Sequence, residues 1–216
     1  MSVFFPIGKP IKVKSSVELL AFQCQDTIVQ LAEICPGATF DLHHHQESQM
    51  GMVFNQGLEM NINGEKAILT PLQDVYVADA NVPHGSVNTT SETVRCFDVK
   101  RLIPEGNKQI DDNDNFENKI FKLVSTKDEE TGFDCQWGTG SWFELKITQI
   151  PPDGKLPVNQ SVRDKMGILL NGKLVMTVGE EEQTLEYGKI YYAPTEISYS
   201  GYNQSNQDVC LIEIGI

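Results

Sequence analysis

An internal repeat constrains the fold of this 216-residue chain more than any other feature. Residues 50–55 (MGMVFN) recur as residues 166–171 (MGILLN) in the second half. After a deletion of one residue, the same spacing relates residues 76–78 (YVA) to residues 191–193 (YYA). Self-similarity at one fixed offset is the signature of a duplicated structural unit. The sequence therefore predicts two domains of the same fold.

The segment between the two halves has the composition of an exposed linker. Residues 104–114 (PEGNKQIDDND) contain a proline, Gly106 and a run of Asp and Asn. These residue types favour turns and irregular chain over packed structure. We therefore expect an N-terminal domain at residues 1–103, a linker at 104–114 and a C-terminal domain at 115–216.

Both halves have the pattern of β-strands. Four segments are short, rich in β-branched residues and alternate between apolar and polar positions: residues 27–34, 67–77, 144–150 and 174–178. Gly, Pro, Asn and Asp lie between such segments, as they do in antiparallel sheets. A single short helix is expected over residues 115–123, where Asp114 can cap the first turn. The fold class is all-β, and a sandwich or small barrel is predicted for each half.

All four histidines lie between His43 and His84. Side chains alternate between the two faces of a strand, so His43 and His45 point to one side and His44 points to the other. Gln49 follows four residues after His45, and His84 lies on a later strand. These residues predict a site with three histidines and one amide for a divalent transition metal. The alternatives are a surface run of histidines and, for Gln49, a hydrogen bond between neighbouring strands.

Composition limits the partners and the compartment. The formal net charge is −13 and the sequence pI is about 4.7, so no basic surface for nucleic acid or an anionic membrane is expected. The five cysteines include no C-x-x-C pair, which is typical of reduced thiols. No apolar run reaches membrane length, and the first ten residues do not resemble a signal peptide. We therefore expect a cytoplasmic protein. Exposed strand edges can pair with a second copy and most oligomers are homodimers, so a homodimer is the expected assembly.

The histidine motifs resemble those of the cupin superfamily. The pattern Gly37-x5-His43-x-His45-x3-Gln49 follows the first cupin motif, with Gln49 at the position of the usual Glu. The second motif is kept as His84-x3-Asn88. This resemblance implies a bicupin, built of two tandem jelly-roll β-barrels. It also implies one divalent metal in the N-terminal barrel, with Fe2+, Co2+, Ni2+, Zn2+ and Mn2+ all open.

Residues 43–53, 81–85 and 100–102 closely resemble the bicupin isomerases of bacilysin (anticapsin) biosynthesis, and a cyanobacterial relative in the aeruginosin pathway is the alternative. The resemblance implies a 1,3-allylic proton shift in a 2-oxo acid of the dihydro-hydroxyphenylpyruvate type. His43, His45, Gln49 and His84 would carry the catalysis through the metal. Arg101, Tyr76 and Met52 are predicted to bind the substrate. The alternatives are an exposed surface position for Arg101 and a packing role for Met52. The proton-transferring base stays open among Tyr76, Glu59, a metal ligand, a water and a metal-bound hydroxide.

The second half lacks this ligand set. The repeat aligns Asn159, Ser161, Lys165 and Tyr199 with the four predicted ligands, and none of them is a good transition-metal ligand. We therefore expect no second metal. Lys165 is predicted to project into the second barrel and to hold an Asp, a Glu or an anionic ligand there, with exposure to solvent as the alternative. Two other functions remain open: an Fe(II) cupin dioxygenase and a non-catalytic small-molecule-binding cupin.

Overall fold

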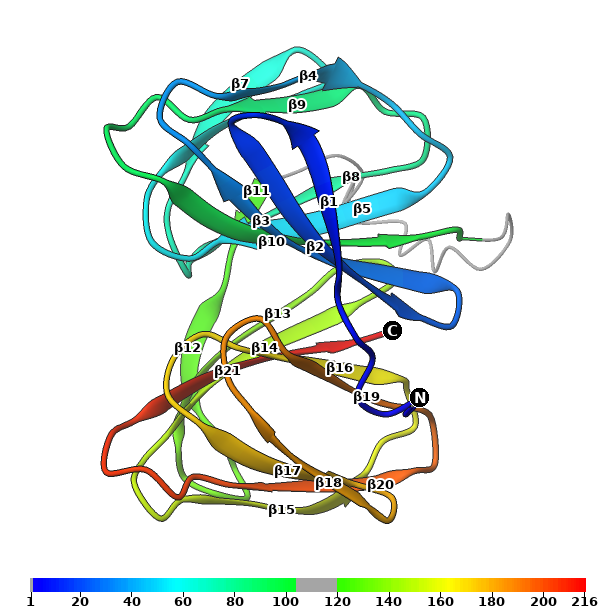
Figure 1. The fold of residues 1–216 in the computed structure, drawn as a ribbon, viewed down its shortest axis with the longest axis vertical. Helices are drawn as coiled ribbons and strands as arrows, with labels where there is room; N and C mark the ends of the chain where they lie inside the picture. The colour runs from blue at the N-terminus through cyan, green and yellow to red at the C-terminus, as the bar shows by residue number, and fades with distance from the viewer. Residues whose placement is uncertain (1, 104–119) are drawn as a thin grey trace. The chain divides into compact units, whose positions relative to one another are not determined.

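The computed structural model describes residues 2–103 and 120–216 of the chain, and all regular structure in them is β-strand. The chain forms two compact units (Figure 1). One unit is Gly8–Leu123, and the other combines Met1–Ile7 with Val124–Ile216. The described residues include no helix with the length and hydropathy of a membrane span.

The N-terminal unit is a jelly roll of two sheets. The larger sheet has the order β1-β2-β3-β10-β5-β8-β11, and the smaller one has the order β4-β9-β6-β7. Its strands are β1 (Lys9–Lys14), β2 (Val17–Cys24), β3 (Thr27–Ile34), β4 (Thr39–His43), β5 (Ser48–Val53), β6 (Leu58–Ile62), β7 (Glu65–Leu69), β8 (Asp74–Ala78), β9 (His84–Val87), β10 (Val94–Arg101) and β11 (Ile120–Lys122).

The C-terminal unit repeats this topology. Its sheets have the orders β12-β13-β14-β21-β16-β19 and β15-β20-β17-β18, so β5, β8 and β10 correspond to β16, β19 and β21. Its strands are β12 (Val124–Lys127), β13 (Asp134–Thr139), β14 (Glu144–Ile150), β15 (Lys155–Gln160), β16 (Lys165–Leu169), β17 (Leu174–Val178), β18 (Glu181–Leu185), β19 (Ile190–Ala193), β20 (Ser198–Tyr202) and β21 (Val209–Gly215). The predicted all-β bicupin fold is therefore confirmed.

Each unit has its own apolar core, because alternate residues of the strands face inward. On β6 and on β17 the first, third and fifth residues are buried and the two between them are partly exposed. The core of the N-terminal unit includes Ile34, Val53 and Met60, and that of the C-terminal unit includes Ile150, Leu169 and Met176.

Two buried asparagines show how closely the halves match. Asn88 donates from Nδ2 to the carbonyl oxygens of Ile34 and Glu92, each at 2.8 Å. At the aligned position, Asn203 donates in the same way to Ile150 at 2.9 Å and to Gln207 at 2.8 Å. Each amide therefore closes the equivalent loop of its barrel, and the repeat read from the sequence is a structural repeat.

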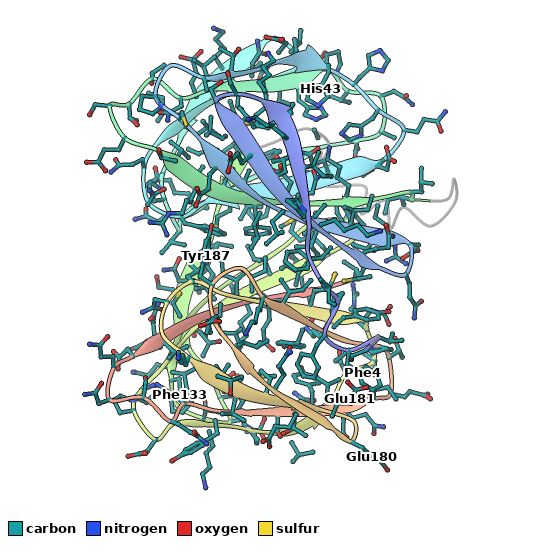
Figure 2. The ribbon with its side chains drawn as sticks, viewed as in Figure 1. Phe4, His43, Phe133, Glu180, Glu181 and Tyr187 are labelled. Atoms are coloured by element: carbon teal, nitrogen blue, oxygen red, sulfur yellow. The ribbon has the colours of Figure 1, made fainter. Side chains whose placement is uncertain are left out.

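The domain boundaries differ from the predicted ones at both ends. Residues 120–122, predicted as the end of a helix, form strand β11, which pairs with β8 of the N-terminal unit. The first residues belong to the C-terminal unit, and Phe4 is labelled in Figure 2. The backbone N–H of Tyr192 on β19 donates to the carbonyl oxygen of Phe4 at 2.7 Å. Each unit thus gains an extra segment beside equivalent strands, β8 and β19. The predicted linker and residues 115–119 lie outside the described residues.

The segment predicted as one strand at residues 67–77 is two strands, β7 and β8. Between them Pro71 cannot donate a backbone hydrogen bond, and Leu72 has a positive φ of 56°. The Asp74 carboxylate accepts from the backbone N–H of Thr70 at 2.7 Å and stabilises this turn. The chain therefore crosses from one sheet to the other here.

Candidate metal centre

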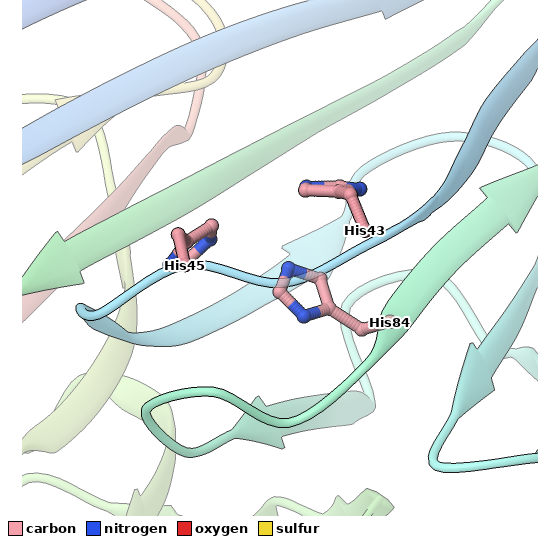
Figure 3. Close-up of side chains that lie close together, drawn as sticks. All are labelled: His43, His45 and His84. Atoms are coloured by element: carbon pink, nitrogen blue, oxygen red, sulfur yellow. The ribbon is translucent and has the colours of Figure 1, made fainter.

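Three histidines converge at one end of the N-terminal barrel (Figure 3). His43 ends β4 and pairs in register with His84, the first residue of β9, while His45 lies just after β4. The ring centroid of His84 lies 4.6 Å from that of His43 and 4.9 Å from that of His45. One nitrogen of each ring lies within 4.8 Å of the others, so the group can hold a metal ion.

Each ring is oriented by a hydrogen bond to a backbone carbonyl. Nδ1 of His43 lies 2.8 Å from the oxygen of Asp41, Nδ1 of His45 lies 2.9 Å from that of Glu47, and Nδ1 of His84 lies 2.9 Å from that of Val82. A carbonyl only accepts, so each Nδ1 carries the proton. With the proton held on Nδ1, Nε2 is the nitrogen of each ring that can present a lone pair, as in a metal-binding histidine.

His84 is the most informative of the three. Its side chain is buried, and its Nε2 is a buried nitrogen with no hydrogen-bond partner. Burial lowers the pKa of His84 to about 4, so the ring is neutral at neutral pH. A buried polar atom without a partner is costly unless a ligand satisfies it. The orphaned nitrogen and the convergent lone pairs fit a divalent transition metal.

Gln49 adds an oxygen to this group. On β5 its Oε1 lies 3.0 Å from Nε2 of His45. Both atoms are acceptors when the His45 proton is on Nδ1, so a cation that both atoms can bind would stabilise this pair. The amide nitrogen of Gln49 donates to the hydroxyl of Tyr76, and Tyr76 donates to Asp98. The structure thus brings together all four predicted ligands and Tyr76.

A cavity of about 370 Å³ opens beside the histidines. Its walls are mostly apolar and include Leu19, Phe40 and Met60. The polar residues in its lining are Lys14, Gln30, Asp41, His43, Gln49, Tyr76, His84, Ser86, Asp98 and Lys100. An apolar cavity with a few convergent polar groups is typical of a site for one small molecule.

Strand alternation keeps three predicted residues out of this cavity. Arg101 follows Lys100 on β10, points to the other face of the sheet and pairs with Asp26 at 3.1 Å. Met52 is fully buried on β5, one position away from the cavity-facing Val53. Glu59 pairs with Lys66 at 2.9 Å and does not line the cavity. The geometry gives no support to the roles predicted for them, and His44 lies outside the histidine cluster, as expected from alternation.

The polar cavity residues that the sequence analysis missed include Asp98 and Lys100. Both lie on β10, where an acidic residue in the apolar run Phe97-Asp98-Val99 was the available signal. Burial raises the pKa of Asp98, although the Lys100 ammonium and the Tyr76 hydrogen bond act in the opposite direction. Burial, together with Asp98, raises the pKa of Tyr76 well above its usual value, so Tyr76 keeps its proton.

The C-terminal barrel has an ion pair where the first barrel has a ligand. Lys165, aligned with Gln49, pairs with Glu144, and the two side chains are 15% and 24% exposed. The prediction that Lys165 holds an acidic group is therefore confirmed. Tyr199 occupies the position of His84, and burial raises its pKa well above the usual value of a tyrosine. Among the described residues, the only cluster suited to a metal is that of His43, His45 and His84.

Two jelly-roll units, one of them with histidines converging from paired strands, define a two-barrel cupin. A model of the cupin domain matches residues 30–100, which include all four predicted ligands. The crystal structure of AerE from Microcystis aeruginosa superimposes with a TM-score of 0.90 at 45% identity, covering 100% of this chain and 99% of that one. The chain therefore belongs to the cupin superfamily, in the family of two-barrel cupins that includes AerE.

Two further relatives mark the range of this similarity. The H2HPP isomerase of Bacillus subtilis is 28% identical over 207 residues, which are 95% of this chain and 86% of the isomerase. A variant of B. subtilis oxalate decarboxylase superimposes with a TM-score of 0.77 at 12% identity, covering 96% of this chain and 74% of that one. The oxalate decarboxylase shares the fold, whereas the isomerase is similar in sequence over nearly the whole chain.

Proposed function

We propose that this protein is a metal-dependent isomerase of the dihydro-hydroxyphenylpyruvate type. It moves a carbon–carbon double bond of a 2-oxo acid by a 1,3-allylic proton shift. The reaction removes a proton from one carbon and returns one to the carbon two positions away, so it consumes no oxidant. The proposed setting is secondary-metabolite biosynthesis of the bacilysin or aeruginosin kind.

The observation that carries this proposal is the combination of the histidine cluster with the Lys100 ammonium in a cavity whose walls are mostly apolar. The other cation of the cavity lining, Lys14, pairs with Asp41 at 2.6 Å. Lys100 lies opposite Gln49 in the β10–β5 ladder, so both side chains face the cavity side by side. Within the described part of the chain, Lys100 forms no ion pair. Its ammonium is therefore available for the carboxylate of a 2-oxo acid, while the apolar wall accepts the ring.

His43, His45, His84 and Gln49 would hold the metal. A bound divalent cation supplies Lewis acidity, which stabilises the negative charge that develops on a 2-oxo acid when a neighbouring proton leaves. Four neutral ligands leave the full double charge of the ion in place, whereas the usual Glu would cancel part of it. His84 is buried, so on its side of the site water screens the attraction between the ion and this charge less. Fe2+, Co2+, Ni2+, Zn2+ and Mn2+ all accept imidazole nitrogen.

Turnover in the absence of oxygen tests the proposal. The protein is loaded with each metal in turn and given the dihydro-hydroxyphenylpyruvate substrate, and the ultraviolet spectrum is followed as the double bond moves. We expect a spectral change under nitrogen at the same rate as in air, with no oxygen consumed. Oxygen consumption coupled to product would instead identify a cupin dioxygenase. Tight binding of the 2-oxo acid without any product would identify a binding protein.

A further inference from the structure

Three residues on neighbouring strands form one row across the larger sheet of the N-terminal unit. Asp98 on β10 lies opposite Gly51 on β5, and Gly51 lies opposite Tyr76 on β8. A side chain at Gly51 would collide with both neighbours, because its Cβ would lie 2.6 Å from Asp98 Oδ1 and 2.6 Å from Tyr76 Cε1. The glycine therefore lets the Tyr76 hydroxyl reach Asp98 over the middle strand.

The hydrogen bonds of this row have a defined direction. The single hydroxyl proton of Tyr76 is donated to Asp98. The Tyr76 oxygen must then accept from its other neighbour, and it accepts from the amide nitrogen of Gln49. With that nitrogen engaged, the Gln49 oxygen is left facing His45 at 3.0 Å. A glutamate at position 49 would instead place an acceptor against an oxygen that has no proton to give.

We propose that Tyr76 and Asp98 are positioning residues that set the orientation of the Gln49 amide, so that its oxygen and not its nitrogen faces the histidines. We call the hydrogen bonds from Tyr76 to Asp98 and from Gln49 to Tyr76 the relay. The relay also explains why the ligand position holds an amide where cupins usually have a carboxylate. The negative charge lies on Asp98, which interacts with the Gln49 amide directly as well as through Tyr76. This inference rests on the proposed metal-binding role of Gln49.

The C-terminal barrel contains the same row without a metal site. Glu213, Gly167 and Tyr191 are opposite one another on β21, β16 and β19, and Tyr191 donates to Glu213 at 2.5 Å. There the relay stops, because Lys165 pairs with Glu144 instead. The tyrosine–carboxylate pair therefore forms without a ligand to orient, and Tyr191 is a matched control for Tyr76.

The first experiment measures metal affinity in Tyr76→Phe and Tyr191→Phe by calorimetry with Co2+, together with the visible spectrum of the bound Co2+. Removing a group that orients a ligand costs roughly 10–100-fold in metal affinity. We expect a loss of that size and a changed spectrum for Tyr76→Phe, and neither for Tyr191→Phe. Unchanged affinity and spectrum in Tyr76→Phe would overturn the proposal. Equal losses in the two variants would overturn it too, because they would indicate a purely structural role.

The second experiment reverses the relay. In the wild-type background, Asp98→Asn should lower Co2+ affinity, because the neutral side chain is a weaker acceptor for Tyr76. In the Gln49→Glu background it should raise affinity, because the new amide can donate to Tyr76, which then donates to the introduced carboxylate. The sign of the Asp98→Asn effect thus depends on residue 49. The same sign in both backgrounds contradicts the relay.

These measurements separate the relay from the proposed reaction, because metal affinity does not depend on turnover. If His45→Ala does not weaken Co2+ binding, the metal site itself is wrong and the relay falls with it. If Tyr76→Phe and Asp98→Asn change Co2+ affinity as expected but no 2-oxo acid is isomerised, the proposed function fails and the relay stands.

Discussion

Single-residue replacements at aligned positions distinguish the barrel with the histidine cluster from the barrel with the Lys165–Glu144 ion pair. Gln49 is replaced by Lys165, His84 by Tyr199 and Lys100 by Gly215. The glycine at position 215 makes room for the ion pair between Lys165 and Glu144. A Cβ at Gly215 would lie 2.6 Å from Glu144 Oε1 and 2.8 Å from Lys165 Nζ. In the first barrel the corresponding space is part of the cavity.

Lys100→Met is expected to raise the KM for the 2-oxo acid at least about tenfold, because the carboxylate loses its cation. Metal affinity should change little, since Lys100 is not a ligand. Arg101→Met decides between the residue chosen from the sequence and the one placed by the structure, and steady-state kinetics of both variants provide the measurement. A raised KM in the Arg101 variant alone would refute the role of Lys100.

Lys165→Met should destabilise the C-terminal unit by about 1–3 kcal/mol, because Glu144 keeps a partly buried charge without its partner. Both tryptophans of the chain, Trp137 and Trp142, lie in this unit, so their fluorescence during urea unfolding reports its stability. Lys127→Met is the control, since its ion pair with Asp134 is exposed. Identical midpoints for the wild type and the Lys165 variant would show that the pair contributes nothing.

At the scale of the element, the alternation of side chains along a strand decides which of two neighbouring residues reaches the site. On β10 the residues that line the cavity are Cys96, Asp98 and Lys100, and the residues between them face the other way. In the segment His43–His45, the same alternation places His43 and His45 in the histidine cluster and leaves His44 outside it. A strand therefore presents every second residue to a ligand, and the register with its neighbours selects which set.

His45→Ala and His84→Ala are expected to abolish activity and to weaken metal binding strongly, while His44→Ala keeps most of both. The reason is that the His44 side chain is exposed and lies outside the cluster. Metal content after dialysis, compared with turnover, checks the three variants. A folded His44 variant that binds metal but is inactive would mean that this side chain acts on the substrate.

The turn between β12 and β13 contains a pH-dependent contact. Burial alone would raise the pKa of Asp128, but hydrogen bonds from Lys146 and Thr131 outweigh it and hold the pKa at about 2. A lowered pKa means that the stabilisation is complete above the unfolded value of about 3.9 and is lost as pH falls towards 2.

Asp128→Asn should therefore cost about 1–2 kcal/mol at pH 7, and this difference should shrink below pH 4. Tryptophan fluorescence in urea at several pH values measures it, with the exposed Asp134→Asn as the control. A cost that is the same at pH 7 and pH 2.5 would rule out the carboxylate charge as its cause.

At the scale of the whole molecule, duplication has produced two barrels with one fold and different contents. The N-terminal barrel holds the histidine cluster and the cavity, and the core of the C-terminal barrel includes Tyr191 and Tyr199, whose ring centroids lie 5.8 Å apart. Their hydroxyl-bearing rings pack within the apolar core of that unit. One fold thus supports both a cavity beside a histidine cluster and a core that includes two tyrosine rings.

Metal analysis of the purified protein should accordingly give about one divalent ion per chain. The histidine nitrogens should lie roughly 2.0–2.3 Å from the ion, as X-ray absorption spectroscopy can measure. Treatment with a chelator should remove the ion and the activity together. Two ions bound with similar affinity would contradict the loss of ligands in the second barrel.

Features that depend on local periodicity could be predicted from the amino-acid sequence. The repeat, the strands β3, β14 and β17, and the convergence of His43 with His45 all follow from patterns within a few residues of one another or from direct self-similarity. Such patterns are readable because the side chains of a strand alternate strictly.

Features that depend on strand register could not be predicted from the sequence and are seen only in the folded sheets. Asp98, Gly51 and Tyr76 form a row because three strands from distant parts of the chain pair in one alignment. The same register turns Lys100 towards Gln49 and Arg101 away from it. A shift of one residue would exchange the two faces, and that choice is made by burial of apolar side chains across the whole sheet.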